Sequence, residues 1–350
     1  MTRERPAWRS PLTGTILCSV LLLLAISVWL LADERTSRSD ALRTGGLAGG
    51  AVIALYALWL NDRRRRIEEA RHELESSRVS DERFARSIEL LGHDTDQVRV
   101  GAMHALAGLA RSRPEYTQTV LDVLCSYLRR PFHHPRFQGE PDATDRESER
   151  ELQVRLTAQR LVVDLLPQAG TPGAPSYDLD LTGAALEYLD LSGRRLGTVV
   201  LRYTYLHSST NVSECEFTGP VWFTSARTGH GRLAGRFLCR NAVFHERAWF
   251  AKARFTSIAD FTGTTFAGET SFRGAVFAGD ALLGETSFPG TADLRDARFH
   301  GYLDLRWTRG PQAVPLDDTL VEPDRGADLP DGWTTEELPD GRTRLTAPAT

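Results

Sequence analysis

The feature that most constrains the fold is a regular recurrence of large apolar residues in the second half of the chain. The spacing is five residues at first and later alternates between six and five. The large positions are Leu181, Leu186, Leu191, Leu196, Leu201 and Leu206, and later Phe244, Phe250, Phe255, Phe261, Phe266, Phe272, Phe277, Leu283, Phe288, Leu294, Phe299 and Leu305. In the later series Ala or Thr precedes nearly every large residue by two positions. Neither a helix nor an ordinary strand has this period. A repeat sustained over so many units indicates a solenoid.

The period itself suggests a square coil. If each short unit turns one corner, four units close one turn, and equivalent residues stack about 4.8 Å apart with backbone pairing between turns. A turn then takes about 22 residues, and about six turns make a rod of about 29 Å. The pattern resembles the pentapeptide-repeat family over residues 177–306. This resemblance implies a right-handed quadrilateral β-helix.

The repeat is interrupted between Val212 and Asn241. Phe217 and Phe223 fit one register, Leu233 and Leu238 fit another, and arginines fall at positions that should be apolar or small. We expect a protruding loop at the glycines of this segment, Gly229, Gly231 and Gly235. The loop is either a tolerated insertion, which we favour, or a contact site for a partner, since loops on rigid scaffolds often carry function. The candidate contact residues are Arg227, His230, Arg232 and Arg236.

The N-terminal part of the chain contains two uncharged, apolar segments. Residues 12–32 have the length that a helix needs to cross about 30 Å of hydrocarbon. A cleaved signal peptide fits less well, because the apolar run is long and no A-x-A site follows it. Residues 44–60 are shorter and glycine-rich, and they are predicted to be a second span. The alternative is an amphiphilic segment that packs on the first helix.

The arginines that flank these segments predict the orientation. They are more numerous before the first segment and after the second than between the two. The positive-inside rule then places both termini in the cytoplasm, in a two-span protein of the cell membrane. Arg63, Arg64, Arg65 and Arg66 are predicted to contact the membrane surface, where each cation gains about 1 kcal/mol. A simple stop-transfer role is the alternative that we favour.

Charged and amphipathic helices are predicted between the apolar segments and the repeat. Helix starts are expected at Ser80, at Asp94 with Gln97, and at Ser112 with Glu115. The second and third of these helices resemble one HEAT or armadillo unit, which must pack on neighbouring helices or cap the next domain. The predicted division is a cytoplasmic tail 1–11, span 12–32, external loop 33–43, span 44–60, charged helix 61–79, helical region 80–130, linker 131–148, helix 149–166, linker 167–176, β-helix 177–306 and acidic, proline-rich tail 307–350.

Composition and motifs argue against most chemical functions. Four cysteines lie far apart and are predicted to be reduced, buried thiols. His133 and His134 lie in a loop that we expect to be flexible and solvated, without further ligands at metal-binding spacing. No phosphate loop, catalytic carboxylate pair or triad pattern occurs in a supporting context. We therefore predict a non-enzyme with no catalytic residue, metal or cofactor. Lys252 is the only lysine beside many arginines, which is typical of a GC-rich bacterial genome.

Three functions are compared. The leading hypothesis is a membrane-anchored scaffold that presents the β-helix to an unidentified protein partner. A membrane effector, such as a small pore or transporter subunit with the rod as regulatory stalk, is the alternative, and self-association is possible. Some pentapeptide-repeat proteins mimic DNA and bind topoisomerases, but residues 177–306 contain 14 acidic and 14 basic residues, so the necessary negative surface is missing. Nucleic acid is an improbable partner, because the whole chain has a formal net charge of −4.

Overall fold

The computed structural model describes residues 11–31, 38–138 and 145–348. Residues 1–10 of the predicted cytoplasmic tail, residues 33–37 of the predicted loop 33–43 and residues 139–144 of the linker 131–148 lie outside these residues. The chain divides into two compact units, Met1–Glu82 and Arg83–Thr350. The helices are α1 Pro11–Leu31, α2 Arg38–Leu91, α3 Asp96–Ser112, α4 Thr117–Leu128 and α5 Arg146–Leu165, with 3-10 turns η2 Pro114–Tyr116, η3 Pro135–Gln138 and η4 Pro323–Arg325.

Helix α2 is 54 residues long and corrects several predicted boundaries. It runs without a break through part of the loop 33–43, through 44–60 and 61–79, and past Ser80. Ser80 does not cap a new helix, because its hydroxyl donates to the carbonyl of Ser76 one turn earlier, which keeps the residue inside the helix. The helix ends at Leu91, before Gly92. Within the described residues, no helix combines the length and the apolar character needed to cross a membrane.

Helices α3, α4 and α5 pack on one another around a shared core. Buried side chains from all three helices form it: Met103, Leu106, Val120, Leu121, Leu124, Val154, Ala158 and Leu161. The predicted cap at Asp94 is wrong by one residue, since Thr95 is the N-cap of α3. Helix α5 begins before the predicted Glu149, at Arg146, because the Asp145 carboxylate accepts from the backbone N–H groups of Glu147 and Ser148.

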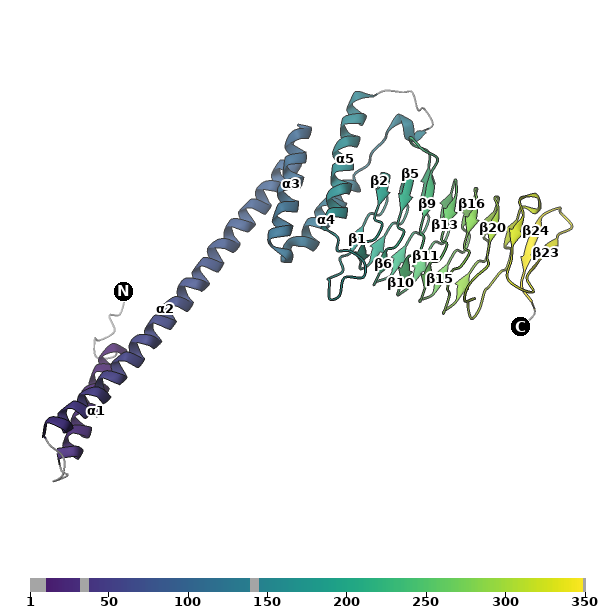
Figure 1. Cartoon of the computed structure of the whole chain (residues 1–350). Coiled ribbons are helices and arrows are strands. Elements are labelled where there is room, and N and C mark those ends of the chain that lie inside the picture. The colour runs from purple at the N-terminus through teal and green to yellow at the C-terminus, as the bar shows by residue number, and fades with distance from the viewer. Residues whose placement is uncertain (1–10, 32–37, 139–144, 349–350) are drawn as a thin grey trace, which may run out of the picture. The chain divides into compact units, whose positions relative to one another are not determined.

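The rest of the chain is a β-solenoid with four short strands in each regular turn (Figure 1). The strands are β1 Leu179–Asp180, β2 Ala185–Asp190, β3 Arg195–Leu196, β4 Val199–Val200, β5 Tyr205–Asn211, β6 Glu216–Phe217, β7 Val221–Trp222, β8 Arg227–Gly229, β9 Arg236–Leu238, β10 Val243–Phe244, β11 Ala248–Trp249, β12 Arg254–Phe255, β13 Ala259–Asp260, β14 Thr265–Phe266, β15 Thr270–Ser271, β16 Val276–Phe277, β17 Ala281–Leu282, β18 Ala292–Asp293, β19 Arg298–Phe299, β20 Leu303–Asp304, β21 Leu320–Val321, β22 Ala327–Asp328, β23 Thr334–Glu337 and β24 Thr343–Thr346.

Strands of successive turns pair in parallel and form the sides of the solenoid. One stack runs β2, β5, β9, β13, β17, β20 and β22, so the solenoid has about seven turns rather than the predicted six. The predicted turn length is confirmed in the regular part, where Val243 pairs with Thr265. The first turn is shorter, since Leu179 pairs with Val199. The turn from Val221 to its partner Ala248 is longer than the regular ones.

The predicted large and small positions form the solenoid core. All the large residues from Phe244 to Leu305 are at most 3% exposed, and the Ala and Thr residues two positions earlier are also buried. The rings stack along the axis: those of Phe223 and Phe250 lie 5.0 Å apart, and those of Phe250 and Phe272 also lie 5.0 Å apart. The axis of the solenoid is therefore filled with side chains at the density of a protein interior.

Helices α4 and α5 cover the first turn of the solenoid. The Gln118 side chain donates to the carbonyl of Asp178 and accepts from its N–H, both at 2.9 Å. Arg129 forms an ion pair with Asp180 at 2.5 Å, and Arg155 donates to the carbonyl of Ala185. The side chains thus pair the backbone groups of an edge that would otherwise be open to another strand.

The C-terminal segment differs from the prediction of a tail that soon becomes disordered. Thr319 and Val321 occupy small and large positions of a further turn, and Val321 pairs in register with Phe299 of the turn before. Strands β21 and β22 continue the solenoid, and the antiparallel hairpin β23–β24 adds to β21. The hairpin extends the last turn at β21, while β18 and β22 are the end strands of their own stacks.

Candidate functional site

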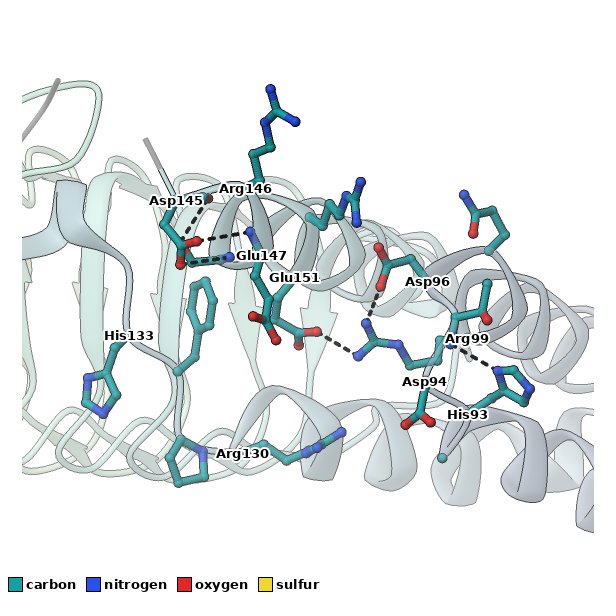
Figure 2. Close-up of a pocket in the computed structure, with 17 residues that line it drawn as sticks. His93, Asp94, Asp96, Arg99, Arg130, His133, Asp145, Arg146, Glu147 and Glu151 are labelled. Atoms are coloured by element: carbon teal, nitrogen blue, oxygen red, sulfur yellow. Dashed lines mark hydrogen bonds and ion pairs between the residues drawn. The ribbon is translucent and has the colours of Figure 1, made fainter. Parts of the chain in front are cut away.

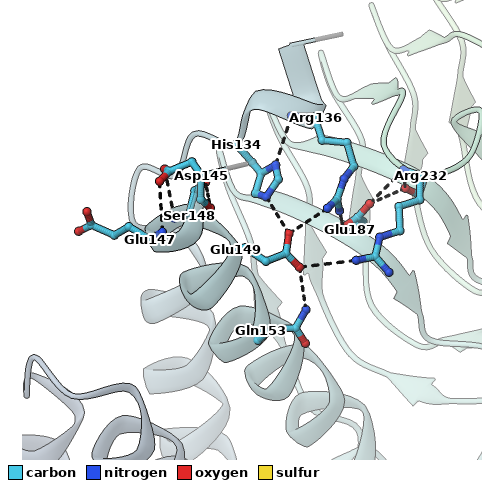
Figure 3. Close-up of polar contacts among 10 residues, drawn as sticks. His134, Arg136, Asp145, Glu147, Ser148, Glu149, Gln153, Glu187 and Arg232 are labelled. Atoms are coloured by element: carbon cyan, nitrogen blue, oxygen red, sulfur yellow. Dashed lines mark hydrogen bonds and ion pairs between the residues drawn. The ribbon is translucent and has the colours of Figure 1, made fainter. Parts of the chain in front are cut away.

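The interrupting loop, residues 229–236, lies against the helical region instead of protruding freely (Figure 3). Glu149 at the start of α5 contacts the side chains of two arginines and one histidine. Arg136 Nη2 lies 2.9 Å and His134 Nε2 lies 3.3 Å from Oε2 of Glu149, and Arg232 Nη2 from the loop lies 3.5 Å from its Oε1. Burial tends to raise the pKa of Glu149, but the hydrogen bond from Gln153 and the charge of Arg136 hold it below its ordinary value.

A second carboxylate, Glu187 of β2, joins the loop to the solenoid. It is 1% exposed, and its Oε1 accepts from Ser208 Oγ at 2.7 Å and from the backbone N–H of Arg232 at 3.2 Å. Arg136 Nη1 lies 3.4 Å from the other oxygen. Arg136 therefore links the two carboxylates. We call His134, Arg136, Glu149, Glu187 and Arg232 the clasp.

An aromatic contact lies beside the clasp. The rings of Phe137 and His207 stack with their centroids 3.7 Å apart and their planes 4° from parallel. His207 Nδ1 lies 2.9 Å from the carbonyl oxygen of His230 in the loop. Burial lowers the pKa of His207, so the ring is neutral at neutral pH and donates this bond.

The structure separates the four predicted contact residues into two groups. His230 and Arg232 are engaged in contacts within the chain, at His207 and the clasp. Arg227 lies over the Tyr205 ring at 5.9 Å, and Arg236 is exposed in β9. The Arg232 side chain thus joins the loop to α5, and the backbone carbonyl of His230 joins it to β5.

Sequence reasoning missed most of the clasp. Its members come from four segments that are distant in the sequence, and none has a local motif. Two signals were available: Arg232, which is one of the predicted contact residues, and the pair His133 and His134, in a loop predicted to be flexible and solvated. That prediction is wrong for His134, which is 2% exposed and in contact with Glu149.

A cleft of about 1350 Å³ opens in the helical region (Figure 2). It lies between the turn before α3, the loop after α4 and the start of α5. Arg99 lies beside it, with ion pairs of 2.5 Å to Asp96 and 2.6 Å to Glu151 and a hydrogen bond of 2.7 Å to the Tyr127 hydroxyl. Each of these three charged side chains therefore has a partner of opposite charge within the network.

The cysteines and the possible metal ligands of the described residues lie apart from one another. No group of three His, Cys, Asp or Glu side chains there is arranged to hold a metal ion. Burial raises the pKa of Cys125 and Cys215 to about 12, so both thiols are protonated and unreactive at neutral pH. Cys239 is also buried, whereas Cys18 is exposed, contrary to the prediction that all four are buried.

The four predicted membrane-contact arginines lie on an exposed part of α2. Arg65 pairs with Glu69 and Arg66 with Asp62, each at 2.8 Å within the helix. Arg63 lies over the Trp59 ring at 5.3 Å. Such exposed pairs within one helix contribute only tenths of a kcal/mol.

Comparison with known proteins supports the interpretation of the repeat. Residues 261–308 match the family model for pentapeptide repeats, which has 9 copies. The chain carries pentapeptide repeats. The match lies in the regular part of the solenoid, where buried residues fill the small and large positions of the repeat. No curated protein and no solved structure matches the chain.

Proposed function

We propose that the chain is a non-enzymatic scaffold whose pentapeptide-repeat solenoid presents a rigid surface to a partner protein. The observation that carries this proposal is the filled axis. The phenylalanines that stack along it are fully buried, so no substrate can enter between them. Binding therefore falls to the outward side chains, which the paired strands hold at regular positions. A first turn covered by helices and a last turn extended by a hairpin suit a module that acts through its sides.

We also propose that residues 12–60 attach the scaffold to membrane lipid, with Arg63 to Arg66 near the headgroups. Large apolar side chains of α1 and α2 are strongly exposed within the chain. They are Leu17, Leu21, Leu24, Val28 and Trp29 of α1 and Leu47, Ile53, Leu55, Leu58 and Trp59 of α2. Exposed apolar side chains gathered in this way favour contact with lipid or with another protein over contact with water.

The scaffold proposal is tested by crosslinking the tagged full-length chain in its native cells and identifying what co-purifies. A chain without residues 1–61 is analysed in parallel. Recovery of one defined protein by both chains supports the scaffold. Recovery of self-oligomers alone, and only with residues 1–61 present, contradicts it and favours a membrane effector.

Membrane attachment is tested separately, by fractionation of the same cells. The full-length chain is expected in the membrane fraction after alkaline carbonate washing, and the chain without residues 1–61 in the supernatant. If both chains are found in the supernatant, the attachment proposal is wrong, while the scaffold proposal is unaffected.

A further inference from the structure

Two adjacent sides of the solenoid meet at an edge that is rich in aromatic and basic side chains. On one side, Trp222 of β7 pairs in register with Trp249 of β11. On the other side, Arg227 of β8 pairs with Arg254 of β12. The chain passes from Trp249 to Arg254 around a corner at Lys252, which has a left-handed backbone (φ 57°) and is exposed. We call these five residues the basic aromatic edge.

The turn before the edge extends it with two tyrosines. Tyr203 occupies the same corner position as Lys252, with φ 57° and 60% exposure, and Tyr205 is 47% exposed. Arginines lie over the aromatic rings along these turns. The pairs are Arg202 over Trp222 at 5.1 Å, Arg227 over Tyr205 at 5.9 Å and Arg247 over Trp249 at 5.9 Å. Stacking on a ring restrains a guanidinium while leaving its N–H groups able to donate.

The cations of the edge are not matched by carboxylates in the part of the chain that the structure describes. Among the described residues, none of Arg202, Arg227, Lys252 and Arg254 has an acidic group within ion-pair distance. Several arginines in later turns of the solenoid are compensated instead. They include Arg273 with Asp296, Arg295 with Asp293 and Arg306 with Asp304. The solenoid as a whole is close to neutral, so these cations give the edge a local positive charge.

We propose that the basic aromatic edge binds a short acidic segment of a partner protein. This inference rests on the proposed scaffold function and names the surface and the partner's chemistry. Trp, Tyr and Arg are the residues that contribute most to binding at protein interfaces. Carboxylates of the segment pair with Arg227, Lys252 and Arg254, and an apolar side chain of the segment packs on Trp222 and Trp249.

The size of the edge favours a peptide over nucleic acid. The turns that carry Tyr205, Arg227 and Arg254 span two strand spacings, about 10 Å, which is the length of about three extended residues. A nucleic acid carries charge continuously along its length and extends past so small a patch. The chain has a formal net charge of −4, so it repels such a polyanion outside the edge.

The sole lysine of the chain permits a site-specific test. A library of short random peptides is selected on the immobilised full chain, and the strongest binder is resynthesised with a fluorescent label for anisotropy. A carbodiimide then couples any peptide carboxylate that touches Lys252 to its Nζ as an amide, and mass spectrometry locates the bond. The expected result is a selection enriched in Asp and Glu, with coupling at Lys252.

Charge reversal with a matched control decides the location. The double variant R227E/R254E should bind the peptide at least about tenfold more weakly, whereas R298E should bind within about twofold. Arg298 is a suitable control because it is exposed and holds the equivalent position two turns after Arg254, outside the aromatic cluster. Far-UV circular dichroism and urea unfolding verify that each variant folds, and R227Q/R254Q replaces the double reversal if it does not.

Three outcomes would overturn the assignment. Enrichment of basic peptides, or of none, contradicts an acidic partner. Acidic peptides that do not couple to Lys252, or that R298E weakens equally, place the site elsewhere while the scaffold proposal stands. Tight binding of an oligothymidylate that depends on Arg227 and Arg254 indicates a nucleic-acid surface instead.

Discussion

Gly231 determines how closely the 229–236 loop approaches the solenoid. A Cβ atom at this position would overlap Ser208 Oγ and lie 2.7 Å from Oε1 of Glu187. We predict that Gly231→Ala lowers the free energy of unfolding by about 1–3 kcal/mol, because the loop and the buried carboxylate must move apart. Urea unfolding measures this change.

Gly108 provides the control for that substitution. It is an exposed position within α3 with no neighbouring atom near its Cβ site. Gly108→Ala should raise stability by up to about 1 kcal/mol, since alanine is the better helix former. Equal effects at the two glycines would contradict the close packing of the loop.

We predict that the burial of His207 makes the stability of the chain depend on pH. Its pKa lies below the ordinary 6.5 because burial disfavours the charged ring, so the unfolded chain takes up a proton at higher pH than the folded chain. The contribution to stability is therefore complete above 6.5 and is lost as the pH falls toward the lower folded value. His207→Gln can still donate to the His230 carbonyl but does not titrate.

The variant should lose less stability than the wild type between about pH 7 and about pH 5. Urea unfolding at both pH values measures the two losses, and carboxylates that titrate in this range affect both chains alike. Losses of the same size in both chains would show that His207 is not responsible.

At the scale of single residues, burial in the solenoid could be predicted and the clasp could not. A residue such as Phe250 repeats the environment of Phe272 one turn later, so periodicity alone places it in the core. Glu149 and Glu187 are charged residues in unrelated segments. Their proximity arises from the packing of α5 on the first turns, which no local pattern encodes.

The stack of phenylalanine rings is the main stabilising element of the solenoid. Phe250 is fully buried, and its ring stacks on those of Phe223 and Phe272. Phe250→Ala should cost about 3–5 kcal/mol, because the lost contacts leave a cavity within a filled axis. Thermal or urea unfolding tests this value. Glu246→Ala, at an exposed position in the same turn, should change stability by less than about 0.5 kcal/mol. A small loss at Phe250 would mean that the axis is loosely packed.

Element boundaries were least predictable where the repeat changes length. The long turn between Val221 and Ala248 places Phe237 in the core and leaves Leu233 44% exposed, so the predicted register through Leu233 and Leu238 is wrong. The extra residues of this turn shift the alternation of large and small residues. At the next core position the sequence offers two adjacent apolar residues, Phe237 and Leu238, and the period alone does not choose between them. The turn at Thr319 and Val321 was missed because those residues are smaller than the preceding phenylalanines, although their distance along the chain from the turn before was a usable signal.

At the scale of the whole molecule, the second unit should fold independently. Its hydrophobic core is one continuous cluster from Met103 to Leu345. We predict that removal of residues 1–82 leaves a β-rich, monodisperse protein with one cooperative unfolding transition. Circular dichroism and size-exclusion chromatography check this outcome. Loss of the transition would show that the first unit is needed for folding.

The central claim is that the outward side chains of the solenoid carry the function by contacting a partner protein. The most direct measurement is quantitative mass spectrometry of proteins crosslinked in native cells to the full-length wild type, to R227E/R254E and to R298E. We predict that one protein is recovered with the wild type and with R298E, and falls by about tenfold with R227E/R254E. Equal recovery with all three chains would contradict the assigned surface. Recovery of no protein other than the chain itself would contradict the scaffold.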